Sequence, residues 1–74
     1  MSRPDARRTV VESSVLASIA YAVDATLEIE FRTGAIYRYV AVPEAVFQGL
    51  IAAESKGAYF NRHVRTRFRY QRLA

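Results

Sequence analysis

The C-terminal part of the chain is rich in Lys and Arg, and such side chains bind anions. From Ser55 onward there are six Lys or Arg residues and no Asp or Glu, although the whole chain has 11 of the former and seven of the latter. Such a one-sided charge distribution is typical of a surface that binds nucleic acid, the commonest large polyanion. Tyr59 lies within this segment and is a candidate to stack on an unpaired base. The candidate phosphate contacts are Lys56, Arg62, Arg65, Arg67, Arg69 and Arg72. A solvated basic face without a partner is the alternative interpretation.

Catalytic chemistry is not indicated by the remaining polar residues. His63 is the only histidine and the chain has no cysteine, which excludes His or Cys metal clusters and thiolate nucleophiles. No spacing suggests a Ser-His-Asp triad or a pair of catalytic carboxylates, and the three glycines form no phosphate-binding loop. We therefore expect a protein that is not an enzyme, with no cofactor and no metal, and with His63 at the surface.

The elements that must position the cations begin with three short β-strands. Apolar residues alternate with small or acidic ones in the segments 19–23 and 27–31, and an Asp24-Ala25 turn joins them. After Gly34 a third β-rich segment runs over residues 36–42. These segments predict a three-stranded antiparallel meander.

Two helices and a last strand follow. Pro43 suits a first helical turn, and Ser55 suits the N-cap of a second helix. In that second helix Arg62 and Arg65 lie opposite Phe60 and Val64, so the arginines are expected to face water. The first helix places four apolar residues in one arc, namely Val46, Phe47, Leu50 and Ile51. With an alternating C-terminal strand, the prediction is an α+β fold of order β-β-β-α-α-β, with the helices on one face of the sheet.

The parity of the loop before Tyr37-Arg38-Tyr39 decides which face these tyrosines share. A three-residue loop, Arg32-Thr33-Gly34 with Gly34 in the left-handed conformation, puts both tyrosines on the apolar face and Arg38 opposite Glu28. A two-residue turn would instead put the tyrosines beside carboxylates, at a cost in packing and with repulsion of a phosphate backbone. We therefore assign Tyr37 and Tyr39 to the core or its rim, with their hydroxyls at the boundary.

One domain is expected, since the 74 residues contain no repeat and no linker. Residues 1–9 are predicted to be a flexible basic tail, and residues 10–74 the domain. The basic start and the apolar segment 15–23 are a poor match to an export signal, because acids interrupt the first and Ser18 the second. No apolar segment is long enough to span a membrane. The expected location is the cytoplasm.

Three blocks of the sequence, "ESSVLASIAYAVDATLEIEF", "GAIYRYVAVPEAVF" and "SKGAYFNRHVRTRFRYQRL", resemble a KTSC domain. This family is named for the C-terminal region of some lysyl-tRNA synthetases and also includes stand-alone small bacterial proteins. Its Tyr-x-Tyr motif corresponds to Tyr37 and Tyr39, and its following proline to Pro43. The Lys-Gly-x-Tyr-Phe-Asn block corresponds to Lys56, Gly57, Tyr59, Phe60 and Asn61. The resemblance covers nearly the whole chain and is compatible with RNA binding.

The sequence therefore leaves two alternative functions. The first is a small non-catalytic module that binds nucleic acid, RNA or tRNA, through the arginine-rich C-terminal segment. The second is a protein-interaction or assembly domain that uses a sheet edge or an apolar patch. The favoured register turns Ile36, Val40 and Val42 to the second face of the sheet, so the expected state is a monomer or a weak homodimer that associates through that face.

Overall fold

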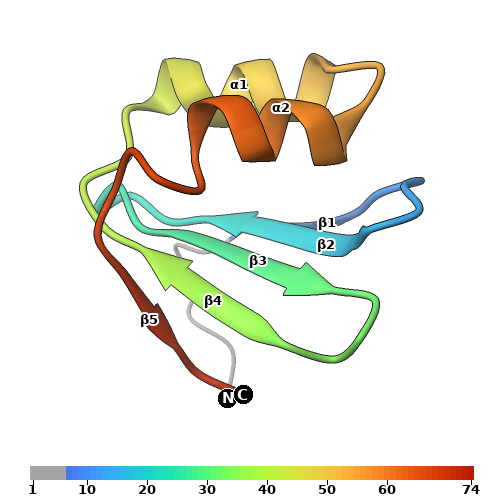
Figure 1. Cartoon of the computed structure of the whole chain (residues 1–74). Coiled ribbons are helices and arrows are strands. Elements are labelled where there is room, and N and C mark those ends of the chain that lie inside the picture. The colour runs from blue at the N-terminus through green and yellow to red at the C-terminus, as the bar shows by residue number, and fades with distance from the viewer. Residues whose placement is uncertain (1–6) are drawn as a thin grey trace.

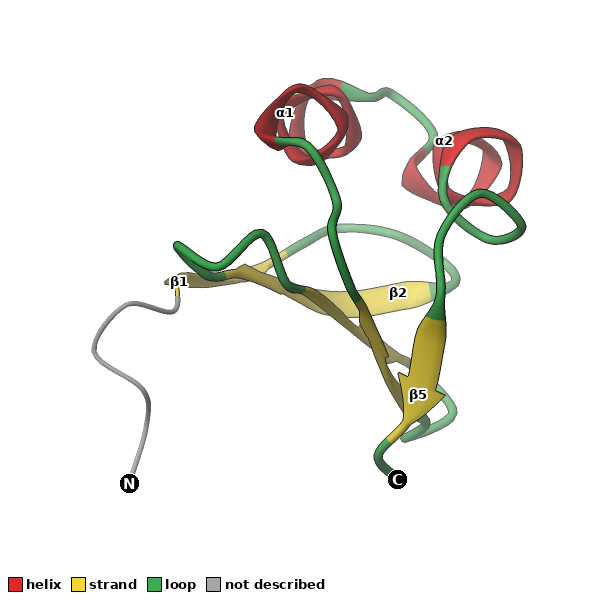
Figure 2. Cartoon of the chain, turned by 90° about the vertical axis from the view of Figure 1, so that its left-hand side faces the viewer, coloured by secondary structure: helices red, strands yellow, loops and turns green. Residues whose placement is uncertain are grey.

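The computed structural model describes residues 7–74, which form one five-stranded antiparallel sheet and two helices. The strands lie in the order in which they occur in the chain, and both helices cover the same face of the sheet (Figures 1 and 2). The α+β class is therefore confirmed. The elements are β1 (Arg7–Val10), β2 (Leu16–Tyr21), β3 (Leu27–Phe31), β4 (Ile36–Tyr39), α1 (Glu44–Ala52), α2 (Lys56–His63) and β5 (Tyr70–Arg72).

The first strand, β1, corrects the predicted strand count from four to five and shortens the predicted tail. It pairs antiparallel with β2, with Thr9 opposite Ile19 and Val10 opposite Ser18. The Val10 side chain is 83% exposed, so β1 is held by its backbone ladder and adds no apolar alternation to the sequence. That is why the segment has no strand signal. The rest of the predicted tail, residues 1–6, lies outside the described residues.

The β3–β4 hairpin confirms the predicted loop parity. Gly34 has φ +97°, and the Phe31 N–H donates to the Ala35 carbonyl at 2.8 Å, which closes the loop of residues 32–34. Arg38 accordingly lies opposite Glu28 and bonds to it at 3.2 Å, while Tyr37 pairs with Ile29. Tyr39 is 2% exposed and belongs to the core, and Tyr37 is half-buried.

The core fills the space between the sheet and the helices. A β-bulge between Leu16 and Ser18 brings Leu16 to the same face as Ile19, and both are fully buried. Leu50 of α1 and Phe60 of α2 close the core from above, and Ser55 caps α2 by accepting from the Ala58 N–H at 3.3 Å. The buried apolar cluster is Val11, Leu16, Ile19, Leu27, Ile29, Tyr39, Val42, Leu50, Phe60 and Val64.

Val42 does not lie on the second face of the sheet, where the alternation placed it, but is fully buried in the core. The strand β4 ends at Tyr39, and Ala41 adopts φ +56°, which breaks the alternation of side chains. The Val42 N–H then donates to the Ala25 carbonyl at 2.9 Å. Val40 keeps an exposed side chain, so the predicted apolar patch on the second face loses one of its members.

Candidate functional site

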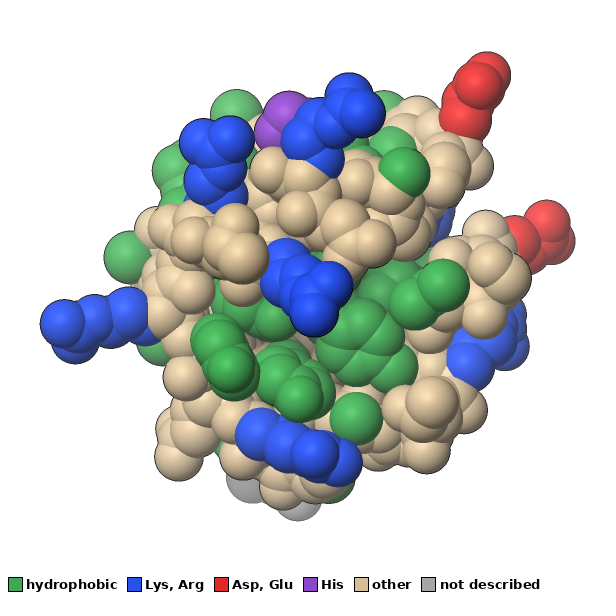
Figure 3. Space-filling view, viewed as in Figure 1, with side chains coloured by type: hydrophobic (Ala, Val, Ile, Leu, Met, Phe, Trp, Pro, Cys, Tyr) green, Lys and Arg blue, Asp and Glu red, His purple; other side chains and the backbone are tan. Residues whose placement is uncertain are grey.

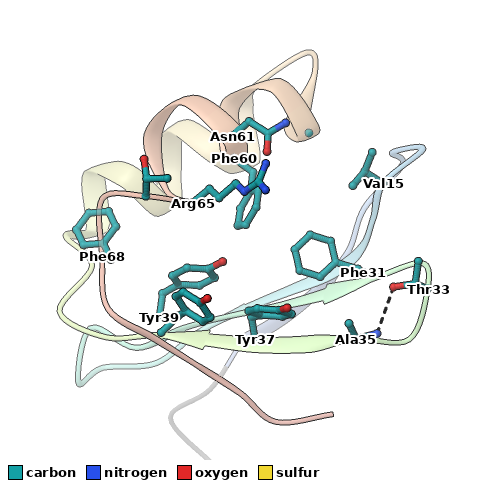
Figure 4. A pocket seen from close by; sticks show the side chains of 13 residues that line it. Val15, Phe31, Thr33, Ala35, Tyr37, Tyr39, Phe60, Asn61, Arg65 and Phe68 are labelled. Atoms are coloured by element: carbon teal, nitrogen blue, oxygen red, sulfur yellow. Dashed lines mark hydrogen bonds between the residues drawn. The ribbon is translucent and has the colours of Figure 1, made fainter.

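An open groove of about 640 Å³ lies between α2 and the β3–β4–β5 end of the sheet (Figure 4). In the space-filling view, hydrophobic side chains are exposed in the middle of this face, with Lys or Arg side chains around them (Figure 3). We call this feature the aromatic groove. Its lining residues include six aromatic ones, Phe31, Tyr37, Tyr39, Phe60, Phe68 and Tyr70.

Strand pairing explains why the rings meet. Tyr39 pairs with Tyr70 across β4 and β5, so both side chains lie on the helix-covered face, with ring centroids 5.5 Å apart. The Tyr37 ring lies 5.3 Å from that of Tyr70 and meets Phe31 edge-on at 5.6 Å. Phe60 reaches down from α2 and meets Tyr39 edge-on at 5.7 Å. The rings therefore form one continuous apolar wall and floor.

Three tyrosine hydroxyls, those of Tyr37, Tyr39 and Tyr70, belong to this groove. Figure 4 shows that the hydroxyls of Tyr37 and Tyr39 point into the open space. Within the described part of the chain none of the three makes a hydrogen bond. Burial, reinforced by the nearby Tyr37 and Tyr70, raises the pKa of Tyr39 to about 12, against an opposing contribution from Arg65. At neutral pH the Tyr39 hydroxyl is thus a protonated group with free hydrogen-bonding capacity.

Two arginines bring positive charge to the groove. Arg65 lines it directly, held by the turn after α2, where its backbone N–H donates to the Phe60 carbonyl at 2.9 Å. The Arg72 guanidinium carbon lies 5.8 Å from the centroid of the Tyr37 ring. No acidic residue lines the groove among residues 7–74. The groove is therefore apolar in its walls and electropositive at its borders.

The other predicted site residues divide into two groups. Arg62, Arg67 and Arg69 are exposed and do not line the groove. Lys56 is half-buried at the start of α2 and donates to the Ala53 carbonyl at 3.0 Å. Tyr59 is half-buried against α1, where its hydroxyl occupies the space that a side chain at Gly49 would need. Both Lys56 and Tyr59 lie outside the aromatic groove.

His63 is exposed, as predicted, and its ring lies 4.4 Å from that of Tyr59. Over residues 7–74 no group of His, Cys, Asp or Glu side chains is arranged to hold a metal ion. None of the described helices is long and apolar enough to cross a membrane.

Sequence reasoning missed most of the groove. It assigned Phe31, Tyr37 and Tyr39 correctly to one face of the sheet but treated that face as covered. Phe68, Tyr70 and the adjacent Asn61 were not considered as site residues. The available signal was the number of aromatic residues in the segments of β3, β4 and β5.

Comparisons with known proteins place the chain in a family. A sequence model of the KTSC domain matches residues 12–68. An uncharacterised protein of Stutzerimonas stutzeri is 42% identical over 69 residues, which cover 90% of this chain and 97% of that protein. A lysine–tRNA ligase of Nostoc punctiforme is 38% identical over 64 residues, which cover 85% of this chain but only 11% of the ligase.

The crystal structure of a KTSC domain protein from Yersinia pestis has the same fold. It superimposes with a TM-score of 0.89 at 34% identity, covering 93% of this chain and 99% of that one. The match spans the whole architecture rather than a single motif. The chain therefore belongs to the KTSC domain family.

Proposed function

We propose that this domain is a small non-catalytic module that binds RNA, with tRNA as the leading candidate. The observation that carries the proposal is a set of exposed arginines in the segment from α2 to β5, of which Arg65 lines the aromatic groove and Arg72 lies beside the Tyr37 ring. We call it the arginine surface; it consists of Arg62, Arg65, Arg67, Arg69 and Arg72.

The electrostatics of this surface support a polyanionic partner. Within residues 7–74 none of its guanidinium groups is paired with an Asp or Glu side chain, and the Arg72 Nε donates to the main-chain oxygen of Ala74 at 2.8 Å. Like charges held close together on a small domain repel one another, and phosphates relieve that repulsion while releasing counterions. Arginine also binds phosphate oxygens in a bidentate manner. Lys56 and Tyr59 have a peripheral place in this proposal, because each is engaged with its own helix or the neighbouring one.

The family relationship also supports RNA as the partner. Related segments occur in lysine–tRNA ligases, whose names state that they act on tRNA. The matched segment is a small part of the ligase, so the aminoacylation reaction is not carried over to this chain. A cytoplasmic location, where tRNA is found, is part of the same proposal.

The decisive experiment is a titration of tRNA and heparin across salt concentrations. Arg62→Gln with Arg65→Gln should lower the log-log salt slope for tRNA by roughly 0.7 to 0.9 per lost phosphate contact. A control with the same change in net charge, Ala45→Glu with Gln48→Glu, alters two exposed positions of α1 and should keep the parent slope. Absence of tRNA binding at low salt would overturn the proposal.

A second candidate, a protein-interaction domain, is favoured by the exposed edge of β5. This strand ends the sheet, and its Tyr70 is 57% exposed, so an extended segment of another protein has a backbone edge to pair with. Equal binding of heparin and tRNA would reduce the arginine surface to non-specific charge and favour this candidate.

A further inference from the structure

We infer that the aromatic groove is the site for an unpaired base of a single-stranded RNA segment, next to the phosphates held by the arginine surface. This inference rests on the proposed function and gives it a substrate class. It predicts that the domain discriminates single-stranded from duplex RNA, which a basic surface alone does not do.

The size and openness of the groove suit a base that has left its helix. Its volume of about 640 Å³ lies within the range of small-molecule binding sites, about 300–1,000 Å³. Bases within a duplex are stacked on one another and do not expose their faces, whereas bases of loops and single strands do. The groove therefore selects for the second kind.

The walls provide stacking surfaces of two kinds. The rings of Phe31 and Tyr37 form one side, and the Arg65 side chain extends over the groove from the α2 side (Figure 4). Aromatic rings and guanidinium planes are the groups on which proteins stack unpaired bases. The same Arg65 lies at the border of the arginine surface, so a stacked base and its phosphate would be held by adjacent residues.

The polar groups of the groove decide between a base and a purely apolar ligand. The hydroxyls of Tyr37, Tyr39 and Tyr70 have no partner within residues 7–74, and the exposed Asn61 adds an amide. An aliphatic side chain from another protein would cover these groups without satisfying them, at a cost in binding. The edge of a base carries donors and acceptors that can satisfy them.

Charge complementarity excludes one further class of ligand. With Arg65 in the lining and Arg72 beside Tyr37, and with no acid among the described lining residues, a cationic ligand would be repelled. The groove is thus suited to an anion that carries a flat ring, which is the chemistry of a nucleotide.

The test uses labelled single-stranded oligoadenylate and a duplex RNA with the same number of phosphates. We expect the single strand to bind more tightly and to change the intrinsic tyrosine fluorescence. The chain has no Trp and five Tyr, of which three line the groove, so this signal reports on the site. Tyr70→Ala should weaken binding of the single strand about tenfold, because the groove loses an aromatic ring that packs on Tyr37 and Tyr39, together with its hydroxyl. It should leave duplex binding and the salt slope unchanged.

Two further variants provide a control outside the groove and a second change within it. Val23→Ala removes an apolar side chain that is 83% exposed in the β2–β3 turn, and it should bind both RNAs like the parent. Asn61→Ala provides a second groove variant at an exposed position should Tyr70→Ala lose the folded circular dichroism spectrum.

The outcomes separate this inference from the proposed function. If both RNAs bind equally and Tyr70→Ala and Asn61→Ala have no effect, the inference is overturned while the arginine surface stands. If neither RNA binds, the proposed function and the inference fail together. If an acidic tyrosine-rich peptide displaces the single strand and binds more tightly than it does, the groove belongs to a protein partner and the inference is overturned.

Discussion

Tyrosines lie at both ends of the helix-covered face of the sheet, and their surroundings differ. At the β2 end, the Tyr21 ring stacks on Phe47 of α1 at 4.8 Å, and its hydroxyl donates to the Val42 carbonyl at 2.6 Å. At the β4–β5 end, the rings of Tyr37 and Tyr70 pack on each other and neither stacks on an aromatic ring of a helix. Their hydroxyls have no hydrogen-bond partner within residues 7–74. The same strand alternation thus produces a closed packing at one end and a binding surface at the other. Helix coverage makes the difference.

The largest expected effect on stability comes from Tyr39, which lies between the closed β2 end and the open β4–β5 end of this face. Tyr39 is 2% exposed and contacts both the core and the groove, so Tyr39→Ala should lower the free energy of unfolding by about 3 kcal/mol. The exposed Tyr70→Ala should cost less than about 1 kcal/mol. Denaturant unfolding of both variants checks the comparison, and near-equal midpoints for Tyr39→Ala and the parent would contradict the burial of Tyr39.

A pH dependence follows from the same residue. Because the pKa of Tyr39 is raised to about 12 in the folded protein, its contribution is fully present below pH 10. It should be lost as the pH rises from 10 through 12, since the folded state disfavours the phenolate. The loss amounts to at most about 3 kcal/mol, since each pKa unit corresponds to about 1.4 kcal/mol. Thermal melts across this pH range should fall less steeply for Tyr39→Phe than for the parent, and parallel curves would exclude Tyr39 as the titrating group.

A pair of conservative changes separates the closed end from the open end. Tyr21→Phe removes the hydrogen bond to the Val42 carbonyl and should cost about 1 kcal/mol. Tyr37→Phe removes a hydroxyl without a partner in the described chain, so its stability should stay within about 0.5 kcal/mol of the parent. Equal destabilisation in urea titrations would mean that the Tyr37 hydroxyl has a partner after all.

The smallest expected effect on stability comes from Ala41, which follows β4 and precedes the buried Val42. Ala41 is exposed and has φ +56°, a conformation that glycine adopts at lower cost. Ala41→Gly should therefore raise the free energy of unfolding by about 0.5 kcal/mol. Val40→Gly, one residue earlier, serves as the control and should lower it. A destabilised Ala41→Gly would show that the positive φ is not the dominant factor at this position.

Several features follow from the sequence alone because they depend on neighbours along the chain. Loop parity around Gly34 fixed the β3–β4 register, and with it the face shared by Phe31, Tyr37 and Tyr39. Ser55 as an N-cap and the spacing of Phe60 predicted α2 and the exposed position of Arg62. Arg65 was expected on this helix opposite Phe60, but α2 ends at His63 and Arg65 lines the same groove as Phe60. The acid-free charge pattern of the C-terminal part is likewise a property of the sequence.

Other features depended on contacts between distant segments. The strand β1 is held by backbone pairing with β2, which does not require an apolar pattern. Val42 is buried because the left-handed Ala41 interrupts the alternation and the Ala25 carbonyl accepts its N–H. The aromatic groove exists because α1 and α2 cover only part of the sheet's apolar face. Alternation determines which face a side chain occupies, but only the placement of the helices decides whether that face is core or binding site.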